Sequence, residues 1–340
     1  MLDRADEIHG SMTAERVELS VVVTVYGCAA CLRELCSRLT ETLTGLVASY
    51  EIVLVDDRAG DGAWKVILDL AQADPGIRGF RLSRNFGQHA AITAGLAQTR
   101  GDRVVVMDCD LQDPPEEIPR LYAQALEGYD IVYGRREQRE GSRLRHALSH
   151  VYFRIMNTFT GTSIDGSYGT FSVISRKVVD EYGRFRDRDR HYLFILYWLG
   201  FRSTSVGYKH RDRATGRSSY GPVQLLRHGL DGAFFQTTVL LRWIVYLGFL
   251  ISAAGAAMAV YIVGAKLANS GAPGWTSLAV FVLVLSGFII TSTGITGLYI
   301  GKVFEQVKDR PLFIIEADTT PACSAAPPTV HELSGSPREA

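Results

Sequence analysis

Two aspartates separated by a single residue, Asp108 and Asp110, stand at the end of the apolar run 102–108. Carboxylates this close repel each other unless a cation or a set of hydrogen-bond donors lies between them. Oxygen ligands suit Mg²⁺ or Mn²⁺, which keep several waters and bind one or two carboxylates together with substrate phosphates. The pair therefore predicts a divalent metal site that serves a phosphate-bearing substrate.

Polar and turn-forming residues also follow two earlier apolar runs. Tyr26 and Gly27 follow the first, and Asp56 and Asp57 follow the second. An aspartate in such a turn can bind a ligand, or it can cap the helix that we expect to begin near Gly62. Asp56 is the better candidate for the capping role, which leaves Asp57 as the candidate for binding.

Three more polar residues raise the same choice between binding and capping. Arg84 and Asn85 lie in a loop that enters a predicted helix, where Asn85 either contacts a ligand or caps that helix. Asp113 stands directly before Pro114 and Pro115, and proline is favoured at the first helical position. We therefore expect Asp113 to be an N-cap.

Any recognition that depends on positive charge must be local, because the chain as a whole is neutral. It has 36 Lys and Arg against 36 Asp and Glu, which excludes a protein that selects nucleic acid by bulk positive charge. Arginine binds phosphate through a planar fork, but mixed-sign charge runs are also common on solvated faces and at lipid headgroups. Both readings stay open for two runs, Arg135, Arg136, Arg139, Arg143 and Arg145, and Arg184, Arg186, Arg188 and Arg190.

Five cysteines at uneven spacing, with no apolar leader ahead of them, predict a reducing compartment and no disulfide scaffold. Cys28 and Cys31 form a CxxC pair, which can indicate a redox or zinc site. No second Cys or His pair stands at metal-site spacing. Cys31 and Cys36 fall on the amphipathic pattern of the next helix, so a core position is the favoured interpretation.

The elements that must position these residues alternate along the first 235 residues. Short β-branched runs are separated by helix-length amphipathic segments, which implies crossover connections and a mainly parallel α/β sheet covered on both faces. In such sheets the ligand site lies beyond the carboxyl ends of the strands. The predicted strands are 19–25, 51–56, 77–83, 102–108 and 129–134.

Two segments near the C-terminus, 243–263 and 278–300, contain no Asp, Glu, Lys or Arg. About 20 apolar residues cross the hydrocarbon core of a bilayer, so we expect two transmembrane helices rather than a pair of buried core helices. Basic residues flank the outer ends and only Lys266 lies between the segments, which puts both termini in the cytoplasm. A Gly297–Gly301 spacing favours helix packing in a homo-oligomer.

The sequence divides into six parts on these patterns. We expect an N-terminal extension at 1–17, an α/β domain at 18–220, a juxtamembrane segment at 221–239, a two-helix membrane hairpin at 240–301, a cytoplasmic return at 302–316 and a disordered tail at 317–340. Residues 221–236 have helical apolar spacing, which fits a helix in the headgroup plane or an ordinary surface helix.

Long motifs in the α/β part resemble known enzymes. The segments VVVTVY, EIVLVDD, LSRNFGQHAAITAGL, GDRVVVMDCDLQDPPEEIP and GYDIVYGRR resemble the membrane-anchored polyprenyl-phosphate glycosyltransferases of family 2. That group includes dolichyl-phosphate mannose synthase and bacterial undecaprenyl-phosphate sugar transferases. The resemblance extends from about residue 18 to 315 and implies a GT-A nucleotide-sugar domain anchored in the bacterial inner membrane.

The resemblance also implies roles for particular residues. It puts Thr24, Tyr26, Asp57, Arg84, Asn85 and Cys109 in the nucleotide-sugar pocket and makes Asp108, Asp110 and Gln112 the Mg²⁺ or Mn²⁺ ligands. Asp110, Arg135, Arg213 and Asp165 would be catalytic, with Asp165 as a general base if one assists. The acceptor phosphate would meet Arg135, Arg213, Ser218 and Ser219.

The implied reaction is metal-dependent, inverting transfer from a nucleotide sugar to polyprenyl phosphate at the cytoplasmic face, with a UDP-sugar favoured over a GDP-sugar. A glycolipid or polysaccharide acceptor, or a non-catalytic scaffold that binds nucleotide sugar, are the alternatives. The sequence departs from the family pattern at Gly27 and Cys28 in the first loop, at Cys109, at Thr170 and Ser172, and at Ser219. We expect these changes to alter which donor fits.

Overall fold

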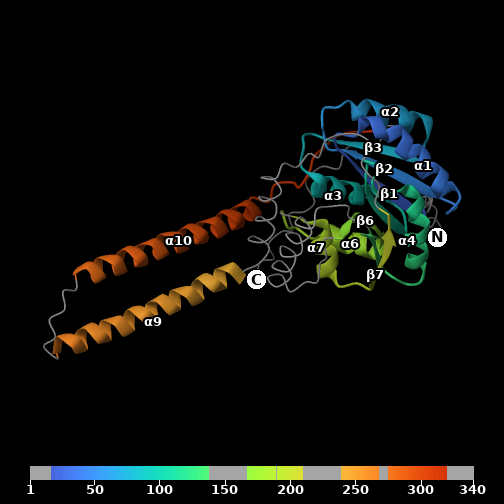
Figure 1. Ribbon diagram of the computed structural model, residues 1–340. Helices are drawn as coiled ribbons and strands as arrows, with labels where there is room; N and C mark the ends of the chain where they lie inside the picture. The colour runs from blue at the N-terminus through green and yellow to red at the C-terminus, as the bar shows by residue number, and fades with distance from the viewer. Residues whose placement is uncertain (1–16, 138–166, 189, 210–238, 268–274, 320–340) are drawn as a thin grey trace, which may run out of the picture.

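The computed structural model describes residues 17–137, 167–188, 190–209, 239–267 and 275–319 (Figure 1). Four predicted site residues, Asp165, Arg213, Ser218 and Ser219, lie outside this part of the chain, as does the predicted helix at 221–236.

The described residues build an eight-stranded sheet with the strand order β7-β5-β6-β4-β1-β2-β3-β8. Strands β1, β2, β3 and β4 pair in parallel, as do β5 and β7. Strand β6 is antiparallel to β4 and β5, and β8 is antiparallel to β3. The bounds are β1 Leu19–Val25, β2 Tyr50–Asp56, β3 Ile77–Leu82, β4 Arg103–Asp108, β5 Ile131–Arg136, β6 Tyr168–Ser175, β7 Ser203–Tyr208 and β8 Ile315–Asp318.

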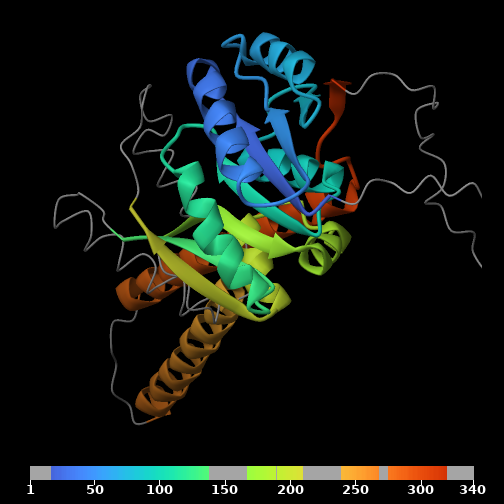
Figure 2. The same ribbon diagram turned by 90° about the vertical axis from the view of Figure 1, so that its right-hand side faces the viewer.

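Helices cover both faces of this sheet, as expected for parallel strands, whose side chains are buried on each side (Figure 2). In β1, Val21 and Val23 belong to one apolar core and Val22 to the other. Helices α1 (Leu32–Thr44), α2 (Ala63–Ala73) and α4 (Ile118–Leu126) pack on the first face. The second face is covered by α3 (Gln88–Gln98), α6 (Arg176–Arg184) and α7 (Tyr192–Leu199).

The five predicted strands are confirmed, with small shifts at their ends, and the prediction of a mainly parallel α/β sheet is correct. Strand β8 corrects the predicted tail. We expected disorder from residue 317, but Ala317 and Asp318 pair with β3, and the Thr319 hydroxyl accepts a hydrogen bond of 2.8 Å from the Gly79 amide. Strand β3 lies about 240 residues earlier in the chain, so no local sequence pattern predicts its pairing with β8.

Two long helices, α9 (Val239–Leu267) and α10 (Trp275–Val307), extend side by side away from the sheet (Figure 1). They contain the two predicted apolar segments. A Cβ added at Gly255 would lie 2.9 Å from Phe281, so a glycine allows the helices to approach there. Among the described residues one helical stretch, Leu285–Val307, is long and apolar enough to cross a bilayer, and the apolar stretch in α9, Ile244–Gly255, is shorter.

A histidine pair joins α3 to the start of α7. The rings of His89 and His191 lie 4.4 Å apart, and Nδ1 of His89 accepts a hydrogen bond of 3.3 Å from the Tyr192 amide. His191 also packs against Phe194, and its Nδ1 has no hydrogen-bond partner in the described part of the chain. Burial lowers the pKa of His191 from 6.5 to about 4.

We predict that His191 makes the fold sensitive to acid. Because the folded-state pKa is depressed, the unfolded chain binds a proton first, so stability is complete above pH 6.5 and is lost as the pH falls towards 4. Between pH 7 and pH 5 this costs about 2 kcal/mol. The variant His191→Phe is expected to lose less stability over that interval in urea unfolding.

His331→Gln removes a histidine near the C-terminus of the chain and serves as the control, with an expected pH dependence equal to that of the parent. Parallel pH profiles for the parent and His191→Phe would contradict the prediction.

Candidate functional site

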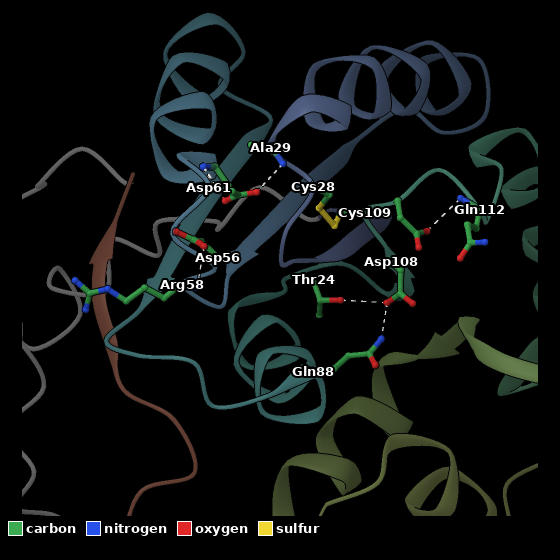
Figure 3. Close-up of a disulfide and its surroundings, with 12 residues drawn as sticks. Thr24, Cys28, Ala29, Asp56, Arg58, Asp61, Gln88, Asp108, Cys109 and Gln112 are labelled. Atoms are coloured by element: carbon green, nitrogen blue, oxygen red, sulfur yellow. Dashed lines mark hydrogen bonds between the residues drawn. A yellow bond between two sulfur atoms is a disulfide. The ribbon is translucent and has the colours of Figure 1, made fainter. Parts of the chain in front are cut away.

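Asp108 is held by two hydrogen bonds at the carboxyl edge of the central strands. Strands β1 and β4 are neighbours, with Thr24 opposite Asp108. The Thr24 hydroxyl donates to Oδ1 of Asp108 at 3.2 Å, and the Gln88 amide nitrogen donates to the same oxygen at 2.7 Å (Figure 3). Both donors therefore act on one oxygen and fix the orientation of the carboxylate, while Oδ2 accepts neither of these bonds.

The electrostatic environment of Asp108 disfavours its charge. Burial, followed by the nearby carboxylates of Asp113 and Asp110, raises the pKa of Asp108 from 3.8 to about 6, against the opposing effect of the Gln88 hydrogen bond. A cation bound beside the carboxylate would favour the ionised form instead. The site is therefore arranged for a positive charge that the nearby side chains only partly supply.

Asp110 lies in a tight turn that follows β4. Its Oδ1 accepts a hydrogen bond of 3.2 Å from the amide of Gln112. The intervening Leu111 has φ of 60°, a left-handed conformation that is uncommon for a residue other than glycine, and its side chain is buried in the core. The buried Leu111 side chain thus anchors the turn, and the polar residues on either side of it, Asp110 and Gln112, stay at the edge of the sheet. Non-glycine residues in this conformation are concentrated at functional sites.

Asp108, Asp110 and Gln112 offer oxygen atoms that suit a hard divalent cation. In the part of the chain that the structure describes, no group of three or more His, Cys, Asp and Glu side chains is close enough to hold a metal. The residues present therefore fit an ion that takes most of its ligands from water and from substrate phosphates. They do not fit a closed structural site.

Asp57 binds the backbone of the loop that leads into α3. Its two carboxylate oxygens accept hydrogen bonds from the amides of Phe86, at 2.8 Å, and Gly87, at 2.9 Å. The side chain is 3 % exposed, and burial raises its pKa. Asp57 therefore fixes the loop whose next residue is Gln88, and its predicted contact with the nucleotide stays a prediction.

The capping roles proposed for Asp56 and Asp57 are wrong. Helix α2 begins at Ala63, whose amide donates to Asp61. Asp56 instead accepts a hydrogen bond of 2.9 Å from the Arg58 amide.

The loop before α3 exposes the side chains of Arg84 and Asn85. The guanidinium of Arg84 lies 4.3 Å from the centre of the Phe86 ring. Gly87, not Asn85, is the residue at the N-cap of α3, and no side chain caps that helix. The capping role for Asn85 is therefore wrong, and ligand binding by both residues remains a prediction.

Asp113 is not a helix cap either. The N-cap of the short helix at Pro115–Glu117 is Pro114, which has no side-chain cap. Asp113 is 1 % exposed, accepts a hydrogen bond from the Tyr208 hydroxyl on β7, and lies 3.8 Å from the Arg136 guanidinium. Its partners are more than 20 residues away, which explains why local turn chemistry misled the prediction.

Gln88 contributes to this site although the sequence analysis did not name it, and Arg136 was named there only as one member of an arginine run. Arg136 faces Asp113 and donates to Tyr208 at 3.4 Å, and its charge also acts on Asp108. Arg135, the residue that we expected at a phosphate, is exposed at the end of β5. Gln88 and Arg136 both lie inside motifs that carried the family resemblance, LSRNFGQHAA and YGRR, so the motifs already contained them.

A disulfide joins Cys28, after β1, to Cys109, after β4 (Figure 3). This bond was not expected, because the cysteine spacing predicted a reducing compartment and no disulfide scaffold. Cys28 bonds to a residue 81 positions away and not to Cys31. Cys31 and Cys36 are buried in the core, as predicted, and burial raises the pKa of Cys36 to about 12. Tyr26, predicted to contact the nucleotide, lies two residues before Cys28 and is 49 % exposed.

Comparison with known proteins identifies the family of this chain. Residues 20–183 match the model of glycosyl transferase family 2. A glycosyltransferase of Synechocystis is 35% identical over 302 residues, 88% of this chain and 95% of that protein. The undecaprenyl-phosphate 4-deoxy-4-formamido-L-arabinose transferase of Salmonella paratyphi B is 33% identical over 322 residues, 93% of this chain and 98% of that protein.

Among solved structures, glucosyl-3-phosphoglycerate synthase from Mycobacterium tuberculosis has a TM-score of 0.45 at 20% identity, over 64% of this chain and 80% of that chain. The family match and the relatives aligned over nearly their whole length lead to one conclusion. The chain belongs to glycosyl transferase family 2.

Proposed function

We propose that this protein transfers a sugar from a nucleotide-sugar donor to a polyprenyl phosphate at the cytoplasmic face of a membrane. The observation that carries the proposal is the fixed pair Asp108 and Asp110 at the carboxyl edge of β1 and β4. The Salmonella relative is named for undecaprenyl phosphate and aligns with 93% of this chain, helices α9 and α10 included, which supports the acceptor class.

At the donor end, Asp108, Asp110 and Gln112 would hold Mg²⁺ or Mn²⁺ beside the diphosphate. The ion, when bound, would stabilise the negative charge that develops on the departing nucleoside diphosphate. Thr24 and Gln88 both donate to Oδ1 and so orient the Asp108 carboxylate, while Oδ2 accepts neither bond and would be the oxygen offered to the ion. The buried Asp113 fixes Arg136 close enough to influence Asp108.

At the acceptor end, the nucleophile needs little activation. A phosphate monoester has a second pKa near 6, so it is largely dianionic at pH 7. A phosphate oxygen attacks the anomeric carbon, and the bond from that carbon to the nucleoside diphosphate breaks, with inversion at the carbon. The exposed Arg135 is available to hold the acceptor phosphate, while Arg213, Ser218, Ser219 and Asp165 remain predicted partners of this step.

Helices α9 and α10 support the membrane assignment. They expose large apolar side chains, and soluble monomers rarely expose a contiguous patch of this kind. The exposed residues include Tyr246, Phe249, Leu250, Ile289 and Ile290.

The pairing of β8 with β3 supports two crossings. Strand β8 follows α10 in the chain and is an edge strand of the same sheet that contains β1. The segments before α9 and after α10 therefore lie on the same side of the membrane. If Leu285–Val307 spans the bilayer, a second crossing is required, and α9 is the helix placed to make it. Basic residues at 302, 308 and 310 put that side in the cytoplasm.

The decisive experiment uses the full chain in nanodiscs with undecaprenyl phosphate, Mg²⁺ or Mn²⁺, and a panel of UDP- and GDP-sugars. Mass spectrometry of the lipid extract is expected to detect one lipid that has gained a single sugar and kept its phosphate. The variant Asp110→Asn keeps the size of the side chain and removes its charge, so we expect a loss of at least about 10²-fold in rate. EDTA is expected to abolish transfer.

Two outcomes would contradict the proposal. Equal rates for the parent and Asp110→Asn would remove the metal assignment, and sugar found on a glycolipid or polysaccharide instead of the lipid phosphate would replace the acceptor class.

Gln88→Ala tests the orientation of Asp108. With one of two donors lost, we expect the concentration of Mn²⁺ needed for half-maximal rate to rise about tenfold, because partners of metal ligands typically contribute 10–100-fold to affinity. The maximal rate at saturating Mn²⁺ should change less. Gln98→Ala, at the last residue of the same helix, is the matched control. An unchanged Mn²⁺ dependence in Gln88→Ala would show that Thr24 alone suffices.

A further inference from the structure

The Cys28–Cys109 bond lies at the catalytic edge and not in a peripheral loop. Strands β1 and β4 run in parallel register up to Thr24 and Asp108. Cys109 directly follows Asp108, Cys28 lies in the loop after β1, and the two Cα atoms are 6.3 Å apart. Cys109 is flanked by Asp108 and Asp110. The bond therefore ties the backbone of the acidic motif covalently to the loop after β1.

The other cysteines of the described chain do not offer an equivalent site. Cys31 and Cys36 are buried in the core around α1, and the raised pKa of Cys36 disfavours the reactive thiolate. Cys28 and Cys109, at 6 % and 5 % exposed, are also covered, but Cys28 lies in a loop that contains the exposed Tyr26, and Cys109 lies in a turn that contains the half-buried Asp110. Local opening of this edge would expose the bond.

The proposed function puts this domain at the cytoplasmic face, and a disulfide there calls for a particular explanation. Thiol systems keep cysteines reduced there, and cytosolic disulfides are usually transient, serving catalysis or redox sensing. A bond needed only for stability would be an unreliable choice in that compartment. A bond that ties the acidic motif to the loop after β1 can couple the thiol state of the compartment to the order of the proposed metal ligands.

We propose that Cys28 and Cys109 form a reversible oxidation site that controls the order of the Asp108–Asp110 segment, with a small-molecule thiol or a dithiol protein as its reductant. The coupling to donor binding, unlike the bond and its effect on order, rests on the proposed function. The oxidised form holds the segment in the arrangement described above. Reduction releases the acidic motif from the loop after β1 and weakens donor binding.

The chemistry balances through thiol–disulfide exchange. A thiolate of the reductant attacks one sulfur, the S–S bond breaks, and a mixed disulfide forms while the second cysteine leaves as a thiolate. A second reductant thiolate then attacks the mixed disulfide and releases the first cysteine. The reductant is oxidised to a disulfide and supplies two electrons, and the two cysteines take up protons as thiols.

The first test uses the full chain in nanodiscs and needs no nucleotide. Alkylation before reduction, followed by peptide mass spectrometry, is expected to find Cys28 joined to Cys109 after treatment with oxidised glutathione, and both as thiols after dithiothreitol. Amide hydrogen exchange is expected to become faster on reduction at residues 26–29 and 109–113, with little change in β2. The double variant Cys28→Ala/Cys109→Ala should exchange fast at these residues in both conditions.

Cys323→Ser removes a different thiol and is the control, with an exchange pattern that responds to dithiothreitol as the parent does. Failure to form the bond with oxidised glutathione, or exchange that is the same in both redox states, would overturn the proposal.

The second test addresses the coupling to the donor. UDP and GDP, each with Mn²⁺, are titrated into oxidised and reduced protein, and we expect the nucleotide that binds to do so about tenfold more weakly after reduction. Linkage requires the same nucleotide to shift the dithiothreitol midpoint of the bond by the same factor. Equal affinities in the two states would overturn the coupling. Loss of lipid-linked sugar synthesis in both states would count against the proposed function alone, because the exchange difference is measured without any substrate.

Discussion

The register between β1 and β4 is the constraint on which the site depends. Parallel strands end at the same edge of a sheet, and this register sets Thr24 opposite Asp108. The hydroxyl of Thr24 then reaches the carboxylate, and the residues that follow the two strands, Cys28 and Cys109, meet. A shift by one residue would turn the Asp108 side chain to the other face of the sheet and remove both contacts.

The remaining parts of the site support this edge from a distance. Asp57 fixes the loop that presents Gln88, and Gln88 completes the bonding of Asp108. On the other side, Tyr208 and Arg136 surround the buried Asp113. Three strands and one helix therefore contribute to the orientation of a few carboxylates. Such convergence is typical of sites in which preorganised charge is the main catalytic contribution.

Local sequence patterns were sufficient to predict much of the fold. The runs rich in valine and isoleucine identified β1 to β5, because buried parallel strands read as continuous apolar segments. Strand β8, only four residues long and half polar, carries no such signal and exists through its pairing with β3. The acidic pair itself was visible in the sequence. The roles of Asp57, Asp113 and Cys28 were not, because their partners lie 23 to 95 residues away along the chain.

The short link between α10 and β8 restricts where the enzyme can work. Only residues 308–314 separate the end of α10 from β8, a stretch that reaches at most about 25 Å when fully extended. Gln306 restricts this link further, because its side chain forms hydrogen bonds with the backbone of Arg186 and Arg188. With α10 in a bilayer, as proposed, the sheet could not rise far from the lipid surface or rotate freely above it. A substrate confined to the plane of the bilayer would thus find the catalytic edge at a nearly constant height, and diffusion in two dimensions would replace a search through the bulk solvent.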